Sequence, residues 1–222
     1  MCDVINRSAA LALVAMASAS AGALTVPFTE TFAANNSSWT NSANGPAAYL
    51  ATGGPDGSGY ASAPFNFAST NAGSTPAILR CQNTTGASGG NFFGDWITGG
   101  VTTLSFDIRH DASVALQVFA RWTSATAPAF PGIIALGSTV QPNTWTTVTL
   151  DVTSGGTYVP EPGAVYANIF SNVARVQYGA LPGALAGQAV TVNFDIDNVR
   201  IVPTPGAAAI GLVGLVGLRR RR

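Results

Sequence analysis

Apolar and polar residues alternate along several short segments of the chain, and a period of two residues predicts β-strands. The pattern is clearest at 104–108, 114–120, 145–152 and 190–196, and it is weaker at 28–32, 77–81 and 173–178. Turn-forming Gly, Pro, Asn and Ser separate these segments, and no helical period stands out between them. About eight short strands without helices predict an all-β fold in which two sheets form a sandwich.

Two consecutive segments have the pattern of a β-hairpin. Residues 104–108 carry apolar side chains at alternate positions, and 114–120 do the same after a predicted turn at 109–112. His110, the single histidine of the chain, is interpreted as a residue of that turn. Alternation predicts three outward side chains on the second strand, namely Gln117, Phe119 and Arg121.

The last predicted strand changes phase along its length. Alternate residues from 190 to 196 are apolar, whereas Val199 and Ile201 are one residue out of step. A slip of one residue moves a side chain to the other face of a sheet. An extra residue at Asp197-Asn198, a β-bulge, would return Val199 and Ile201 to the core.

Both ends of the chain have the composition of export signals. Residues 1–23 combine Arg7, an apolar stretch at 9–17 and small residues after it, which is the layout of a cleavable signal peptide. At the other end, thirteen uncharged residues, 206–218, precede four arginines. A helix of that length spans roughly 20 Å, less than a bilayer core, and the arginines would stay on the cytoplasmic side. We therefore predict an exported protein with one domain at residues 24–202.

The C-terminal segment 203–222 resembles the sorting signal of bacterial PEP-CTERM proteins. Pro203 and Pro205 precede the apolar helix, and the chain ends with Arg219, Arg220, Arg221 and Arg222. The resemblance implies an exosortase-type processing enzyme as a partner and a transient membrane anchor through this helix. It also implies delivery to the cell surface or the extracellular matrix. Thr204 stands where this signal usually has glutamate.

The two ends hide the charge of the domain between them. The chain has ten arginines, no lysine and ten acidic residues, but five arginines lie in the end segments. Residues 24–202 keep five arginines and nine acids, a net charge of −4. No basic patch remains for a phosphate backbone, so nucleic acid is not expected as a partner. Cys81 is the only cysteine in this region and is interpreted as a buried apolar residue.

Several short motifs resemble galactose-binding-like jelly rolls, the architecture shared by carbohydrate-binding modules and laminin-IV-type domains. The motifs lie at 28–32, 54–60, 144–152 and 194–201, and residues 93–109 are especially similar to laminin-IV-type domains. The resemblance implies that the domain is a single jelly-roll β-sandwich. It does not define the ligand, because one fold carries many functions.

The same resemblance implies a structural Ca²⁺. In these families an acidic residue near the first strand and an aspartate in the last strand often help to hold the ion, and the corresponding residues are Glu30 and Asp197. Oxygen ligands from the Gly-rich loop at Asp56 would add to the six to eight that calcium needs. The alternative is that Glu30 is solvated and that Asp197 caps its own bulge.

A glycan-binding face is implied as well, because such modules stack sugar rings on exposed aromatic residues and bind hydroxyls with polar side chains. The candidates come from loops and from the outward face of one strand, and they are Trp39, Trp96, Phe119 and Arg121. Tyr60 and Tyr158 also lie in or beside loops, and Gln117 shares the outward face. The alternative for each aromatic residue is a place in the core. Trp145, directly before its strand, is interpreted as a core or loop anchor.

No residue is predicted to be catalytic. Nothing pairs two of the nine acids for glycoside hydrolysis, and no nucleophile or phosphate-loop motif occurs. We therefore predict a non-catalytic component of the cell surface or extracellular matrix. The alternative is a carbohydrate-binding module that recognises a polysaccharide, and a secreted glycan-active enzyme is the third class.

Overall fold

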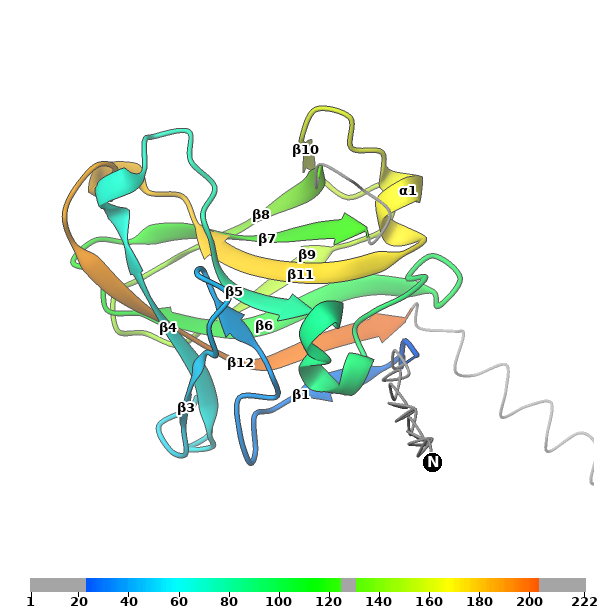
Figure 1. Ribbon diagram of the computed structural model, residues 1–222, viewed down its shortest axis with the longest axis horizontal. Helices are drawn as coiled ribbons and strands as arrows, with labels where there is room; N and C mark the ends of the chain where they lie inside the picture. The colour runs from blue at the N-terminus through cyan, green and yellow to red at the C-terminus, as the bar shows by residue number, and fades with distance from the viewer. Residues whose placement is uncertain (1–22, 125–130, 204–222) are drawn as a thin grey trace, which may run out of the picture.

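The computed structural model describes residues 23–124 and 131–203. They form two antiparallel six-stranded sheets, and Figure 1 shows the sheets as two packed layers. The prediction of an all-β jelly-roll sandwich is confirmed. Most of the predicted signal peptide and all of the C-terminal sorting segment beyond Pro203 lie outside the described residues.

Sheet A has the strand order β3-β4-β12-β6-β9, and β1 pairs with the C-terminal half of β12. Its strands are β1 (Phe28–Glu30), β3 (Ala48–Leu50), β4 (Tyr60–Asn66), β6 (Val101–His110), β9 (Thr146–Asp151) and β12 (Thr191–Pro203). The long strand β12 therefore has neighbours on both sides along its length (Figure 1).

Sheet B has the order β10-β8-β7-β11-β5-β2. Its strands are β2 (Thr40–Asn41), β5 (Ala77–Gln82), β7 (Leu116–Ser124), β8 (Gly132–Val140), β10 (Val159–Pro160) and β11 (Val173–Ala180). The helical segments are short, namely η1 (Phe67–Ser69), η2 (Asn83–Thr85), η3 (Ala87–Gly90), α1 (Tyr166–Phe170) and η4 (Gly183–Leu185). No helix of the described chain has the length and apolar character needed to cross a membrane.

Aromatic residues fill the space between the sheets. Phe106 of sheet A meets Tyr178 of sheet B edge to face, with ring centroids 4.9 Å apart. Trp39 stacks on Tyr178 at 5.4 Å, and its Nε1 donates a 2.8 Å hydrogen bond to Ser88 Oγ. Such pairs contribute about 0.5–1.5 kcal/mol beyond the burial of their area. The loop that carries Trp39 is therefore fixed to the core.

The predicted β-bulge in β12 is confirmed. Asp197 pairs with Asp107 of β6, and the next pair is Arg200 with Ser105. Between these two pairs β12 therefore has one residue more than β6. Asn198 has a positive φ of 48° at this point. Val199 and Ile201 are completely buried as a result.

The predicted hairpin is wrong, because β6 belongs to sheet A and β7 to sheet B. Residues 111–115 carry the chain from one sheet to the other. His110 is not a turn residue, since it ends β6 with its side chain fully buried. Its Nε2 lies 3.0 Å from the carbonyl oxygen of Val140 in sheet B. Because a carbonyl oxygen can only accept, Nε2 is the donor of this hydrogen bond. Two strands with one apolar face each have the same pattern whether they pair side by side or face to face.

Asn198→Val is expected to lower the free energy of unfolding by about 2 kcal/mol, because a β-branched residue is strained at positive φ. The valine also loses the hydrogen bond that Asn198 Nδ2 donates to Asp107. The matched control Asn198→Gly loses this bond too but tolerates the backbone, so its loss should be smaller. Urea denaturation measures both, and equal losses would contradict a requirement for the left-handed backbone.

Candidate functional site

A polar groove lies on the outer face of sheet A, where β4, β12 and β6 run side by side. Ser62, Asp195 and Arg109 stand directly opposite one another across these strands, so alternation places all three on one face. The groove has a volume of about 440 Å³. Its lining consists of Leu50, Tyr60, Ser62, Arg109, His110, Asp111, Asn143, Asn193 and Asp195.

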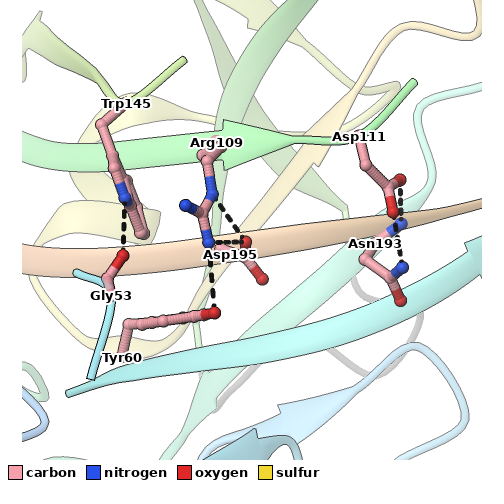
Figure 2. Close-up of polar contacts among 7 residues, drawn as sticks. All are labelled: Gly53, Tyr60, Arg109, Asp111, Trp145, Asn193 and Asp195. Atoms are coloured by element: carbon pink, nitrogen blue, oxygen red, sulfur yellow. Dashed lines mark hydrogen bonds and ion pairs between the residues drawn. The ribbon is translucent and has the colours of Figure 1, made fainter. Parts of the chain in front are cut away.

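An ion pair forms the centre of this groove. Arg109 donates from Nε at 2.9 Å and from Nη2 at 2.7 Å to the same oxygen of Asp195, Oδ2. Burial opposes the charge of Arg109, but the hydrogen bond and negative charge of Asp195 prevail and raise the pKa of Arg109. Figure 2 shows the second carboxylate oxygen of Asp195 turned away from the guanidinium. The ion pair thus leaves Oδ1 of Asp195 without a hydrogen bond from Arg109.

Two aromatic side chains surround the guanidinium of Arg109. Its Cζ lies 4.7 Å from the ring centroid of Trp145 and 5.3 Å from that of Tyr60. Tyr60 Oη accepts a 3.1 Å hydrogen bond from Arg109, and Trp145 Nε1 donates at 3.1 Å to the carbonyl of Gly53 (Figure 2). These contacts hold the arginine and both rings in one orientation.

Asp111 and Asn193 form a second polar pair at the end of β6. Asp111 accepts from the backbone N–H of Asn193 at 2.8 Å and from its Nδ2 at 2.6 Å. Both residues are exposed, and Figure 2 shows them facing each other beside the Arg109–Asp195 pair. The groove therefore presents charged and amide groups at fixed positions along two neighbouring strands.

Asp197 is the next outward residue of β12, and its side chain is completely buried. It accepts hydrogen bonds from Ser58 Oγ at 2.8 Å and from the N–H of Asn198 at 2.7 Å. Burial raises the pKa of Asp197 to about 6 against these hydrogen bonds, and the negative charges of Asp56 and Asp107 add to the rise. Asp195 has Arg109 as its cationic partner, whereas the hydrogen-bond donors to Asp197 are the uncharged Ser58 hydroxyl and Asn198 N–H.

The three predicted calcium ligands are not brought together. Glu30 pairs with the buried Val199 and so points to the inner side of sheet A, where it accepts a hydrogen bond from the N–H of Phe32. Asp197 points to the outer side, where Asp56 lies near it. Among the residues that the structure describes, no three His, Cys, Asp or Glu side chains form a group that could hold a metal ion.

The three aromatic residues predicted to bind glycans are buried, which corrects that prediction. Trp39 and Phe119 are 0% exposed and Trp96 is 1% exposed. Trp39 and Trp96 direct their indole N–H groups to Ser88 Oγ and to the carbonyl of Phe92, so their loops fold over them. Phe119 does lie on the outward face of β7, but it is covered there by Gly179 and the segment at Pro76.

Arg121, the fourth predicted glycan-binding residue, lies on the outer face of sheet B. It donates from Nε and Nη2 to the two oxygens of Glu161, both at 2.7 Å, and from Nη1 to Gln177 Oε1. Glu161 also accepts from the backbone N–H of Gly132 at 2.6 Å. Arg121 is therefore part of a structural network that holds the 160–162 loop against β7 and β8.

The groove residues other than Tyr60 were not predicted from the sequence, although one signal pointed to them. The apolar alternation along 190–196 implies that Asn193 and Asp195 face outward. Trp145 was interpreted as an anchor, yet it is only partly buried and stands beside Arg109. Whether these residues lie close together depends on the order of the strands in the sheet, and the pattern of one strand does not reveal that order.

Asp197→Asn is expected to stabilise the protein at pH 7–8 by about 2–3 kcal/mol, because the raised pKa shows that the fold favours the neutral side chain. The unfavourable effect of the charge appears as pH rises from the unfolded pKa near 3.8 through about 6, so the two proteins should be equally stable near pH 4. Thermal unfolding from pH 4 to 8 measures this difference. Burial lowers the pKa of His110, which weakens both proteins equally in acid and cancels in the comparison. A constant difference across this range would contradict the assignment.

Comparisons with known proteins show the fold and no family. No family model matches the sequence, and no curated protein matches it. Among solved structures, the chain is similar to the CBM22-2 xylan-binding domain of Paenibacillus barcinonensis Xyn10C, with 13% identity and a TM-score of 0.50 over 80% of this chain and 99% of that domain. An exo-β-agarase shares 14% identity and a TM-score of 0.51 over 82% of this chain and 26% of that one.

The CBM22-1 and GH10 modules of Clostridium thermocellum Xyn10B are also similar, with 13% identity and a TM-score of 0.49. This match covers 81% of the present chain, which spans 29% of the length of that two-module chain. The shared feature is a jelly-roll β-sandwich of the kind found in carbohydrate-binding modules.

Proposed function

We propose that the protein is a non-catalytic polysaccharide-binding module and that the groove on the outer face of sheet A holds the sugar chain. The observation that carries the proposal is the Arg109–Asp195 ion pair set between Trp145 and Tyr60. Fixed polar groups in a concave site can hold the hydroxyl edges of a sugar, and Trp145, which is only partly buried, stands beside the ion pair.

The ion pair has capacity left for a ligand. Asp195 receives both guanidinium hydrogen bonds on Oδ2, so its Oδ1 can accept from one hydroxyl. Arg109 uses Nε and Nη2, so its Nη1 can donate to a neighbouring hydroxyl. Ser62 and Asn143 in the lining add further donors and acceptors. Because these groups are already ordered, little side-chain entropy is lost when a sugar binds.

The comparisons support a sugar ligand without identifying it. The Xyn10C domain is described as xylan-binding, and it aligns over nearly its whole length. At 13% identity this likeness extends to the fold alone, so the groove carries the argument for binding. An export route through the two predicted end signals would place such a module at the cell surface or in the extracellular matrix, where polysaccharides occur.

A binding role fits the carboxylates of this face better than hydrolysis does. A glycosidase needs an acid with a raised pKa within reach of the glycosidic oxygen. Asp197 has a raised pKa, but it is fully buried beneath Ser58 and cannot reach a chain in the groove. Asp195 is held by Arg109, which donates two hydrogen bonds to its Oδ2.

Arg109→Ala is expected to weaken polysaccharide binding at least tenfold, since it removes a donor and the partner of Asp195. Asn193→Ala, at an exposed position, should weaken binding by about threefold to tenfold through the loss of one hydrogen-bonding group. Affinity electrophoresis on a panel of polysaccharides, followed by calorimetry on the strongest ligand, measures both effects.

Arg200→Ala is the matched control. Arg200 is an exposed arginine on β12, the strand that also carries Asn193, and it lies outside the groove lining. Its binding should equal that of the unchanged protein. Thermal unfolding of each variant separates loss of the groove from loss of the fold. The proposal fails if no polysaccharide binds, or if Arg109→Ala and Asn193→Ala bind as tightly as the Arg200→Ala control.

A further inference from the structure

The outer face of sheet A carries most of the acidic residues of the described chain. Six aspartates project from its strands or from the loops that border it, namely Asp56, Asp107, Asp111, Asp151, Asp195 and Asp197. Two arginines share this face, Arg109 and Arg200. The face therefore has a formal charge of −4 when every carboxyl is ionised.

The remaining arginines of the described residues cannot offset this charge, because they lie on the opposite side of the sandwich. Arg80, Gln177 and Arg121 stand in one row across sheet B, and Arg175 follows on β11. Burial and the positive charges of Arg175 and Arg121 lower the pKa of Arg80, so these groups act on one another. The molecule thus has an acidic face and a basic face.

The one arginine in the groove is not available as a clamp for an anion. Carboxylate and sulfate groups are bound best by two parallel N–H donors of a guanidinium. Arg109 presents such a pair, Nε and Nη2, to Asp195 of the protein itself. A carboxylate or sulfate in the groove would meet only Nη1, with Asp111 and Asp195 beside it.

We infer that this groove accepts uncharged polysaccharides and rejects chains that carry carboxylate or sulfate groups. The inference rests on the proposed function and specifies the ligand class of the same site. Hydroxyl groups can pair with both the ionised acids and the free arginine donor, whereas an added negative charge meets repulsion at a distance within the Debye length of about 8 Å at 0.15 M salt. Selectivity of this kind comes from a repulsive element as much as from contacts.

The test uses pairs of polysaccharides that share a backbone and differ in charge: desulfated and native κ-carrageenan, hydroxyethylcellulose and carboxymethylcellulose, and arabinoxylan and glucuronoxylan. Binding of the full chain is measured with a chelator present, at about 0.01 M and 0.15 M salt, where the Debye length is about 30 Å and 8 Å. In any pair whose neutral member binds, the neutral polysaccharide should bind at least tenfold tighter than its charged counterpart at low salt. The difference should shrink at higher salt.

The variant Asp56→Asn/Asp151→Asn removes two charges of this face outside the groove lining. It should leave affinity for the neutral chain unchanged and improve binding of the charged chain severalfold at low salt. Asp95→Asn is the matched control, since Asp95 lies in the loop before β6 and is not one of the six aspartates of this face. It should change neither affinity.

Equal or tighter binding of the charged chain, with or without added calcium, would overturn the inference while leaving the polysaccharide-binding function in place. An Asp56→Asn/Asp151→Asn variant that discriminates as strongly as the unchanged protein would overturn it as well. Absence of binding to every neutral and charged chain would instead overturn the proposed function.

Discussion

The bulge in β12 is the constraint on which both the core and the groove depend. This strand lies between β6 on one side and β4 and β1 on the other, so its two faces must serve the interior and the outer surface at once. The extra residue at Asn198 lets Val199 and Ile201 return to the core after Ile196. It also interrupts, after Asp197, the series of alternate outward residues that includes Asn193 and Asp195.

The outward residues of β12 show that this face is not optimised for stability. Asp195 is nearly buried and needs Arg109 as its partner, and a buried ion pair often adds little net stability. Asp197 is fully buried without a cation, and its pKa of about 6 records a penalty for its charge at neutral pH. Proteins tolerate such penalties where they serve a function. The proposed binding of sugar hydroxyls in this groove, with rejection of anionic chains, would be such a function.

Individual strands and their inward and outward faces could be predicted from the sequence, but the pairing of the strands within the sheets could not. The phase change around Asp197 predicted the bulge because the rule involves only neighbours in the chain. The short stretch at Tyr60–Asn66, rich in Ala and Ser with an internal proline, gave no strand pattern, so β4 was missed. Trp39 lies in a polar segment but is fully buried, whereas Trp145 directly precedes β9 and stands beside Arg109 of the groove. Exposure of an aromatic residue depends on which loops cover it, and that is a property of the assembled sandwich.

Mapping of a bound oligosaccharide by NMR chemical shifts tests the central claim, that the outer face of sheet A is the binding surface. The oligosaccharide is a fragment of the polysaccharide that binds most tightly. The account predicts that the amides of Ser62 and Asp195 and the indole N–H of Trp145 shift with saturation, while Gln177 on the outer face of sheet B does not. Shifts centred on Gln177 and Arg121, with the groove residues unchanged, would contradict it.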